Sequence, residues 1–224
     1  MLIEQRDVTF RDEAEIVVPR NEKYVRYATG AIRHIQSTRH DPEKQALIES
    51  RRELKNVMRT QNGRGEIYRT TLLGKYICLI ANKVASIAPS GMGIEMDGER
   101  PGRYDSMNGL PSLFGASTCE LFELLRLFGI LTDAMVRCGG EKISQTIPVE
   151  VARFVDELTG ILDTFLESSR DSDADFAYWD SANTAKERFR ESVRLGFDGA
   201  EETLSGSEIM DFIARAESRI RHSL

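Results

Sequence analysis

The chain has 224 residues, of which 41% are hydrophobic and 29% are charged, so it can bury a sizeable core in one large domain or two small ones. A formal net charge of −6 excludes the uniformly positive surface that attracts nucleic acid phosphates, although local basic patches remain open. The first residues show no signal-peptide pattern, and no uncharged apolar run reaches the roughly 18–20 residues of a membrane span. We therefore expect a cytoplasmic protein with neither nucleic acid nor membrane as a partner.

The cysteines and histidines show no metal-binding or disulfide pattern. Cys78, Cys119 and Cys138 are far apart and form no CxxC pair. An odd, unclustered set favours buried free thiols over a disulfide framework. The three histidines have no metal-ligand spacing, so a zinc site is not expected.

The first 40 residues predict an extended N-terminal arm followed by a first helix. Weak alternation at Val8, Phe10 and residues 16–18 stops at Pro19, which indicates one or two short strands or an extended arm. Apolar residues in 21–40 have helical spacing. We assign 1–40 to this arm and helix, and 41–224 to one helical domain.

From residue 41 onward the sequence predicts an all-α array. Asp41-Pro42-Glu43 indicates a helix start, because Asp caps, Pro loses no needed N–H and Glu favours the dipole. That helix is expected to reach about Thr60. Later helices are expected, in chain order, at 66–87, 117–137 and 148–168, and after capping boxes at Thr184–Glu187 and Ser205–Glu208, with a turn at 171–175. This pattern gives six to seven helices, of which 66–87 is apolar over most of its circumference.

The connection between the helices 66–87 and 117–137 is the strongest candidate for chemistry. It is far longer than the usual 2–8 residues between helices of a bundle, and long ordered loops tend to be functional. Its polar and aromatic side chains include Glu95, Asp97, Glu99, Arg100, Arg103, Tyr104, Asp105 and Asn108. Such a set suits a sugar, because polar groups bind hydroxyls, an aromatic ring stacks and an acid protonates the leaving oxygen.

Each of these loop residues also has a structural interpretation. Glu95, Asp97 and Glu99 could form a solvated acidic loop, since charge runs usually do. Asp105 could cap a short turn. Glu120 is interpreted as the capping-box partner of the preceding serine rather than as a catalytic group.

Two further groups outside the loop have open alternatives. Arg59 and Arg64, beside the glycines at 63 and 65, could bind phosphate or could favour a helix dipole near a C-terminus. The aromatic cluster at 176–179, which includes Trp179, could be a sugar platform but is more typical of a core.

The loop also carries a resemblance to a known family. The stretches Gly91-Met-Gly-Ile-Glu-Met-Asp and Pro101-Gly-Arg-Tyr-Asp-Ser-Met-Asn-Gly-Leu-Pro-Ser-Leu-Phe-Gly-Ala-Ser resemble a segment of large bacterial cellobiose-phosphorylase-like proteins. The resemblance continues through residues 58–73 and 120–126. A general likeness extends over about 40–220, but only the loop matches the family specifically.

The resemblance implies a site and a fold. In disaccharide phosphorylases of this kind the general acid is the aspartate of a Trp-Asn-Asp-x-x-Asn pattern in an (α/α)₆ barrel. Asp105 falls at that aspartate and Asn108 at the later asparagine, while Arg103 and Tyr104 replace the Trp-Asn pair. Such a barrel needs about twelve helices, so this chain would supply part of one, and self-association or a partner chain would complete it.

The resemblance therefore implies an inverting glycoside phosphorylase or hydrolase that acts on an oligosaccharide. Asp105 would be the acid, and the substrate-binding residues would be Glu95, Asp97, Arg103, Tyr104 and Asn108. No metal or organic cofactor is implied, although inorganic phosphate could be a co-substrate. The alternative is a noncatalytic helical module that binds a protein partner or a saccharide.

Overall fold

The structure, a computed structural model, describes residues 2–17, 24–26, 32–34, 38–95 and 116–224. In this part of the chain the fold is mostly helical, as the sequence predicts, with small antiparallel strand pairs in addition. No helix among the described residues is both long and apolar enough to cross a membrane.

Six α-helices are described. They are α2 (Pro42–Ser50), α3 (Leu72–Val84), α5 (Thr118–Arg137), α6 (Val149–Glu167), α7 (Ser172–Ser192) and α8 (Gly206–Ser223), with a short 3₁₀ helix η1 (Gly140–Lys142) after α5. The strands are β1 (Val8–Thr9), β2 (Glu15–Val17), β3 (Tyr24–Arg26), β4 (Ile32–His34), β5 (Thr38–His40), β6 (Arg69–Thr70), β7 (Ile94–Glu95), β8 (Ala116–Ser117), β9 (Ser144–Pro148) and β10 (Glu201–Ser205). They form the antiparallel pairs β1·β6, β2·β5, β3·β4, β7·β8 and β9·β10.

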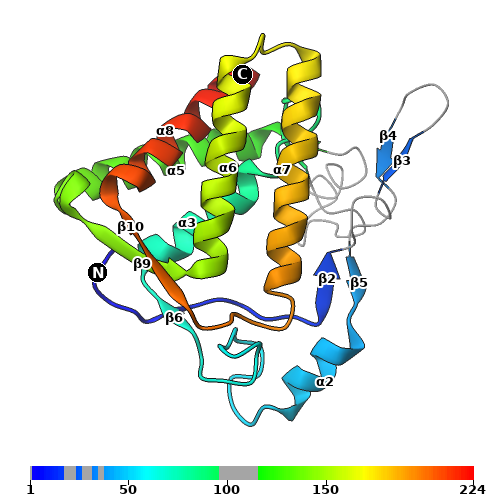
Figure 1. The fold of residues 1–224 in the computed structure, drawn as a ribbon, viewed down its shortest axis with the longest axis vertical. Coiled ribbons are helices and arrows are strands. Elements are labelled where there is room, and N and C mark those ends of the chain that lie inside the picture. The colour runs from blue at the N-terminus through cyan, green and yellow to red at the C-terminus, as the bar shows by residue number, and fades with distance from the viewer. Residues whose placement is uncertain (1, 18–23, 27–31, 35–37, 96–115) are drawn as a thin grey trace.

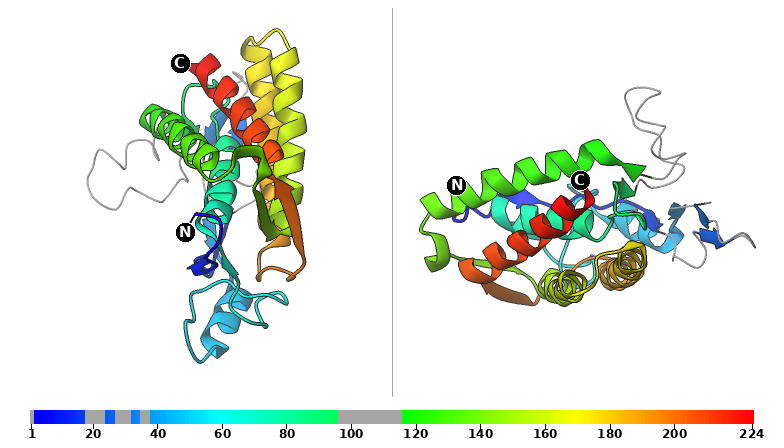
Figure 2. Two further views of the ribbon diagram at one scale, coloured as in Figure 1. Left: turned by 90° about the vertical axis from the view of Figure 1, so that its left-hand side faces the viewer. Right: turned by 90° about the horizontal axis from the view of Figure 1, so that it is seen from above.

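The larger helices form three layers. Seen from above, α5 lies on one side, α3 and α8 lie in the middle, and α6 and α7 lie side by side on the other side (Figure 2). The α2 helix and the loop after it lie beyond the lower end of these layers (Figure 1). One continuous apolar core fills the layers, and its fully buried members include Phe128 of α5, Leu158 of α6 and Phe212 of α8.

The longest strand pair links two helices of this array. Strand β9 runs directly into α6 and strand β10 runs directly into α8 (Figure 1). Ser205 ends β10 and also caps α8, because its hydroxyl accepts the N–H of Glu208 while the Glu208 carboxylate accepts the N–H of Ser205. This capping box is the one that the sequence predicts.

Two helix starts differ from the predicted capping boxes. Thr184 opens no helix, because α7 passes through it and its hydroxyl donates to the carbonyl of Asp180 four residues earlier. The true start is at Asp171, whose carboxylate accepts two backbone N–H groups, so the expected turn at 171–175 is the first turn of α7. At α5, Ser117 makes no capping hydrogen bond with its side chain.

The predicted first helix in 21–40 is wrong where the structure describes it. Residues 24–26, 32–34 and 38–40 are strands in antiparallel pairs. Their helical spacing of apolar residues was therefore overridden by strand pairing, and the glycine at 30 already disfavoured a helix. The short strands expected near residues 8 and 16 are confirmed as β1 and β2.

The helix predicted to reach Thr60 ends at Ser50 instead. The next residue, Arg51, takes an extended backbone conformation, and its guanidinium donates to the carbonyls of Lys55, Val57 and Gly63. These bonds hold the following chain in an irregular turn. The start at Asp41 is confirmed, because its carboxylate accepts two N–H groups of the first turn.

All three cysteines are free, as predicted, but only one of them is buried. Cys78 lies in the core, and burial raises the pKa of its thiol to about 11. Cys119 and Cys138, at the two ends of α5, are exposed. The expectation of three buried thiols is therefore wrong for these two.

Candidate functional site

The two ends of the candidate loop meet on the helical scaffold. Strand β7 pairs with β8, so that Ile94 lies opposite Ser117 and Glu95 lies opposite Ala116. Ile94 also bridges to Ile87 at the end of the preceding helix segment. We call the residues 86–95 and 116–118 the loop root. It brings the chain before residue 96 and the chain after residue 115 to one place.

The loop root is fixed against α7 and α8 at Gly91. This residue is buried with φ of +73°, and a Cβ there would lie 2.9 Å from the Oδ1 atom of Asp175. The same carboxylate oxygen accepts a 2.7 Å hydrogen bond from Arg219, whose other Nη donates to Ser223. A side chain at position 91 would therefore disturb this buried contact, and glycine is required by both φ and space.

Arg219 itself is fully buried, and its two Nη atoms have hydrogen-bond partners whereas its Nε has none. Its guanidinium carbon lies 4.1 Å from the ring centre of Phe165 and 4.7 Å from that of Tyr178. Together with the ion pair to Asp175, these contacts offset part of the cost of burying the cation, although burial still lowers the pKa of Arg219. The loop therefore leaves the scaffold from a rigid position.

A buried polar cluster lies at the other end of the loop root. The backbone N–H of Glu95 donates to the carbonyl of Ser86 at 2.6 Å, and the Ser86 hydroxyl donates to the carbonyl of Asn82 at 2.7 Å. The ammonium of Lys186, which is 3% exposed, donates to the Ser86 hydroxyl at 3.0 Å. The Lys186 ammonium, the Ser86 hydroxyl and the backbone of Glu95 thus lie together after the C-terminal end of α3.

Of the predicted loop residues, Glu95 is the one that the structure describes. It is half-buried at the loop root, which disfavours the interpretation of this residue as part of a fully solvated loop. Asp97, Arg103, Tyr104, Asp105 and Asn108 lie outside the described residues. Their predicted roles stay predictions.

Glu120 has a different partner from the predicted one. Its carboxylate forms an ion pair with Lys83 of α3, and not with the N-cap of its own helix. The pair ties the first turn of α5 to the last turn of α3. Glu120 therefore joins two layers, and the capping-box interpretation is wrong.

The two predicted phosphate-binding arginines lie together in a pocket of about 440 Å³ between the end of α2 and the turn that follows it. Arg59 donates to the backbone carbonyls of Gly65 and Glu53, and Arg64 is exposed. Because α2 ends at Ser50, neither arginine belongs to that helix, but both line a pocket beside its C-terminal residues Leu47 and Ser50, so the helix-dipole alternative stays open. Within the described ranges, the pocket shares no lining residue with the loop root.

The aromatic cluster on α7 belongs mainly to the core. Tyr178 and Trp179 are each 3% exposed, and the Tyr178 hydroxyl donates to the carbonyl of Val84 at 2.9 Å. Phe176 is half-buried, with its ring centre 5.3 Å from that of Trp179. The core interpretation of this cluster is confirmed for Tyr178 and Trp179.

Sequence reasoning missed Lys186 and Ser86. Lys186 lies on the buried side of α7, one turn after Ala182 and one turn before Phe189. A polar residue at a core position of a continuous helix is a signal for a buried partner. The misplaced helix boundary at Thr184 hid that signal, because it put Lys186 in a first turn, where exposed charge is ordinary.

Among the residues with described positions, no set of three or more His, Cys, Asp or Glu side chains is placed to bind a metal ion.

The fold and the loop root define a mostly helical protein with a long polar segment fixed at both ends. Neither the models of known protein families nor the curated proteins give a match to this chain.

Proposed function

We propose that this chain is a carbohydrate-active protein of the glycoside phosphorylase or hydrolase type, in which Asp105 is the general acid. The observation that supports this most is the loop root. It fixes both ends of the segment that carries Asp105 on a buried scaffold, with half-buried Glu95 at the point where the segment begins. A rigid origin is what a catalytic loop requires, because the geometry of its acid must be reproducible.

The proposed reaction inverts the anomeric carbon. Asp105 donates its proton to the glycosidic oxygen as the bond from that oxygen to the anomeric carbon breaks. A phosphate oxygen forms the new bond to the anomeric carbon from the opposite face, which gives a sugar 1-phosphate and a shortened saccharide. Phosphate needs no carboxylate base, whereas attack by water does.

Three residues are candidates for the base that activates water: Glu95, Asp97 and Glu99. Of these, the structure describes Glu95. In phosphorolysis Glu95 would bind substrate hydroxyls together with Asp97, Arg103, Tyr104 and Asn108. A carboxylate suits either role, because it accepts hydrogen bonds from hydroxyls and from water.

The test is an assay with a panel of oligosaccharides in the presence and absence of inorganic phosphate, with detection of sugar 1-phosphate and of reducing sugar. Asp105→Asn removes the acidic proton and is expected to lower product release by about 10²–10⁴-fold. Asp133→Asn, on the exposed surface of α5, is the matched control and is expected to keep full activity. Full activity of the Asp105→Asn variant would contradict the proposal.

Glu95→Gln separates the two acceptors. Loss of hydrolysis with retained phosphorolysis would identify Glu95 as the base for water. Loss of both reactions, with a raised KM, would assign it to substrate binding instead.

A second candidate is a noncatalytic module that binds a partner chain, including a second copy of itself. The observation that favours it is the outer side of α5, where large apolar side chains are exposed to water. They are Phe122 at 58%, Ile130 at 51% and Val136 at 61% exposed. Exposed apolar patches often mark interaction surfaces.

A further inference from the structure

The pocket beside α2 has a composition unlike that of the protein as a whole. Its lining includes Arg51, Arg52, Arg59 and Arg64, against one acidic residue, Glu53, among the described lining residues. The whole chain has a formal net charge of −6. Four cations around one opening therefore make a local positive region on an acidic protein.

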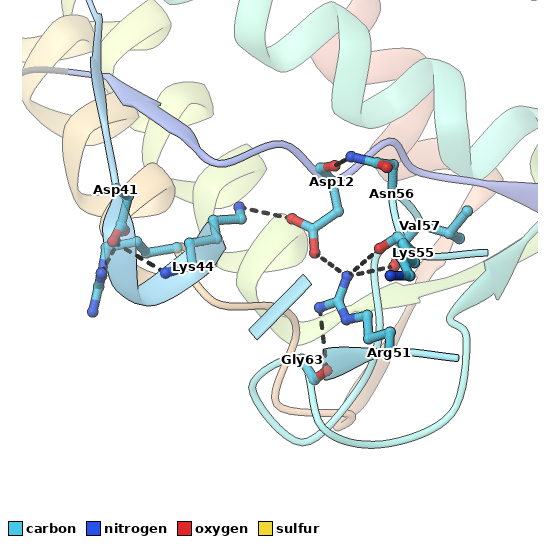
Figure 3. Close-up of polar contacts among 9 residues, drawn as sticks. Asp12, Asp41, Lys44, Arg51, Lys55, Asn56, Val57 and Gly63 are labelled. Carbon is cyan, nitrogen blue, oxygen red and sulfur yellow. Dashed lines mark hydrogen bonds and ion pairs between the residues drawn. The ribbon is translucent and has the colours of Figure 1, made fainter. Parts of the chain in front are cut away.

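Arg51 lines this pocket, and its guanidinium already bonds to groups of the protein. Its Nη1 donates to Asp12 at 2.8 Å and to two backbone carbonyls, and its Nη2 donates to the carbonyl of Gly63 (Figure 3). Asp12 also forms an ion pair with Lys44. Arg51 thus holds the wall of the pocket in place, and Asp12, which it shares with Lys44, offsets part of its charge.

The turn that carries Arg59 and Arg64 is held in an uncommon conformation. Gln61, Asn62 and Gly63 all have positive φ, at 50°, 52° and 86°. The backbone of this turn bonds to Phe197 and Asp198, at distances of 2.9–3.0 Å. Three consecutive left-handed residues persist only when surrounding contacts impose them, and such segments concentrate at binding sites.

Among the residues that the structure describes, the remaining arginines have no acidic partner. Arg59 uses its Nη atoms on the carbonyls of Gly65 and Glu53, which leaves its positive charge unneutralised. Arg52 and Arg64 are exposed at the rim, and within the described part of the chain neither forms an ion pair. Glu53 is the one acidic residue among the described lining residues, so the arginines leave a net positive charge for a ligand.

We propose that this pocket binds a phosphate group, either as inorganic phosphate or as the phosphate of a small phosphomonoester. The planar guanidinium fork matches two oxygens of a phosphate, and arginine is the preferred side chain for that contact. Arg52 and Arg64 contact the phosphate directly from the rim, while Arg59 supplies charge from a fixed position. The volume of about 440 Å³ leaves room for an organic part such as a hexose. This site is separate from the loop root, and the inference does not depend on the proposed glycoside activity.

The test is a calorimetric titration of the whole chain with inorganic phosphate and, separately, with a hexose monophosphate. Arg52→Gln and Arg64→Gln each remove one exposed charge without disturbing a hydrogen bond of the fold, and each is expected to weaken binding about tenfold. Arg137→Gln, an exposed arginine on α5 whose side chain donates to one backbone carbonyl, is the matched control and is expected to bind like the parent.

The outcomes separate clearly. Saturable binding of either probe that is weakened by both rim variants and not by the control supports the site, and tighter binding of the ester shows that the pocket also contacts the sugar. Absence of saturable binding, or equal weakening by Arg137→Gln, overturns it. If the parent binds phosphate at the rim arginines but releases no product from any oligosaccharide, the glycoside proposal fails and the pocket stands. If the parent turns over a glycoside but shows no binding that depends on the rim arginines, the pocket fails and the glycoside proposal stands.

Discussion

At the scale of single residues, the most constrained group is the carboxylate of Asp12. It is 1% exposed and lies between two cations, with Lys44 Nζ at 2.7 Å and Arg51 Nη1 at 2.8 Å (Figure 3). The N-terminal arm, α2 and the turn after α2 all contribute to this cluster. The one carboxylate stabilises two buried cations, so its loss leaves both of them without an ion-pair partner in this cluster.

Asp12→Asn is therefore expected to lower the free energy of unfolding by about 3–5 kcal/mol. The comparison is Asp163→Asn, which breaks a half-exposed pair with Arg215 and is expected to cost at most about 1 kcal/mol. Urea denaturation followed by circular dichroism measures both. Equal losses in the two variants would contradict the special role of the buried cluster.

Glu201 gives the protein a predicted pH dependence. The hydrogen bonds from Arg6 lower the pKa of its carboxyl, burial acts in the opposite direction, and a 2.8 Å hydrogen bond from the Tyr68 hydroxyl adds to the lowering. A carboxyl whose pKa is lower in the folded state stabilises the fold above its unfolded pKa of about 4.3, and this contribution is lost as the pH falls further.

Glu201→Gln is expected to reduce the loss of stability between about pH 5 and about pH 3. The measurement is the urea midpoint across that interval for the parent and the variant. The exposed residue Glu202 provides the neighbouring control, Glu202→Gln. A parent and a Glu201→Gln variant with parallel pH profiles would rule out this contribution.

At the scale of elements, glycines show where the chain has to approach itself closely. Gly63 has φ of +86°, and a Cβ there would lie 2.2 Å from the carbonyl oxygen of Leu195. Gly160, in the middle of α6, has nothing within 4 Å of the position of its Cβ. The same substitution therefore has opposite expected effects at the two sites.

Gly63→Ala is expected to destabilise the fold by at least about 1–3 kcal/mol, because it adds both backbone strain and a clash. Gly160→Ala is expected to stabilise it by about 0.5–1 kcal/mol, since alanine favours the helix. Thermal and urea unfolding of both variants test the pair. A stabilising Gly63→Ala would show that the turn after α2 does not dock on residues 195–198.

At the scale of the whole molecule, the layered arrangement explains which apolar surface is left uncovered. Helices α3 and α8 are covered on both sides, whereas α5 is covered on one side (Figure 2). The extensively apolar helix 66–87 of the sequence prediction is shorter, as α3, and its core positions are buried. Leu72 and Leu79 of α3 are exposed to 37% and 42%, less than the apolar side chains on α5, so α5 is the stronger candidate surface for self-association.

We expect the chain to self-associate through α5 in a concentration-dependent way. Phe122→Ser with Ile130→Ser removes two exposed apolar side chains and is expected to give a monomer, while leaving the secondary structure unchanged. Size-exclusion chromatography with light scattering provides the mass. A parent that is strictly monomeric at all concentrations would remove this surface as a dimer interface.

The mostly helical class, helices α5 and α6 with bounds close to those observed, the starts of α2 and α8, and the free cysteines could all be predicted from the sequence. These features follow from caps and from apolar periodicity, which are local and can be found within a few turns of chain.

The end of α2, the continuity of α7 and the polar groups beneath the loop root depend on contacts between distant parts of the chain. The carbonyls that hold Arg51 come from an irregular turn, Gly63 is set by contact with Leu195, and Lys186 meets a hydroxyl 100 residues earlier in the chain. Such contacts join segments that are distant in sequence, and no local propensity encodes them.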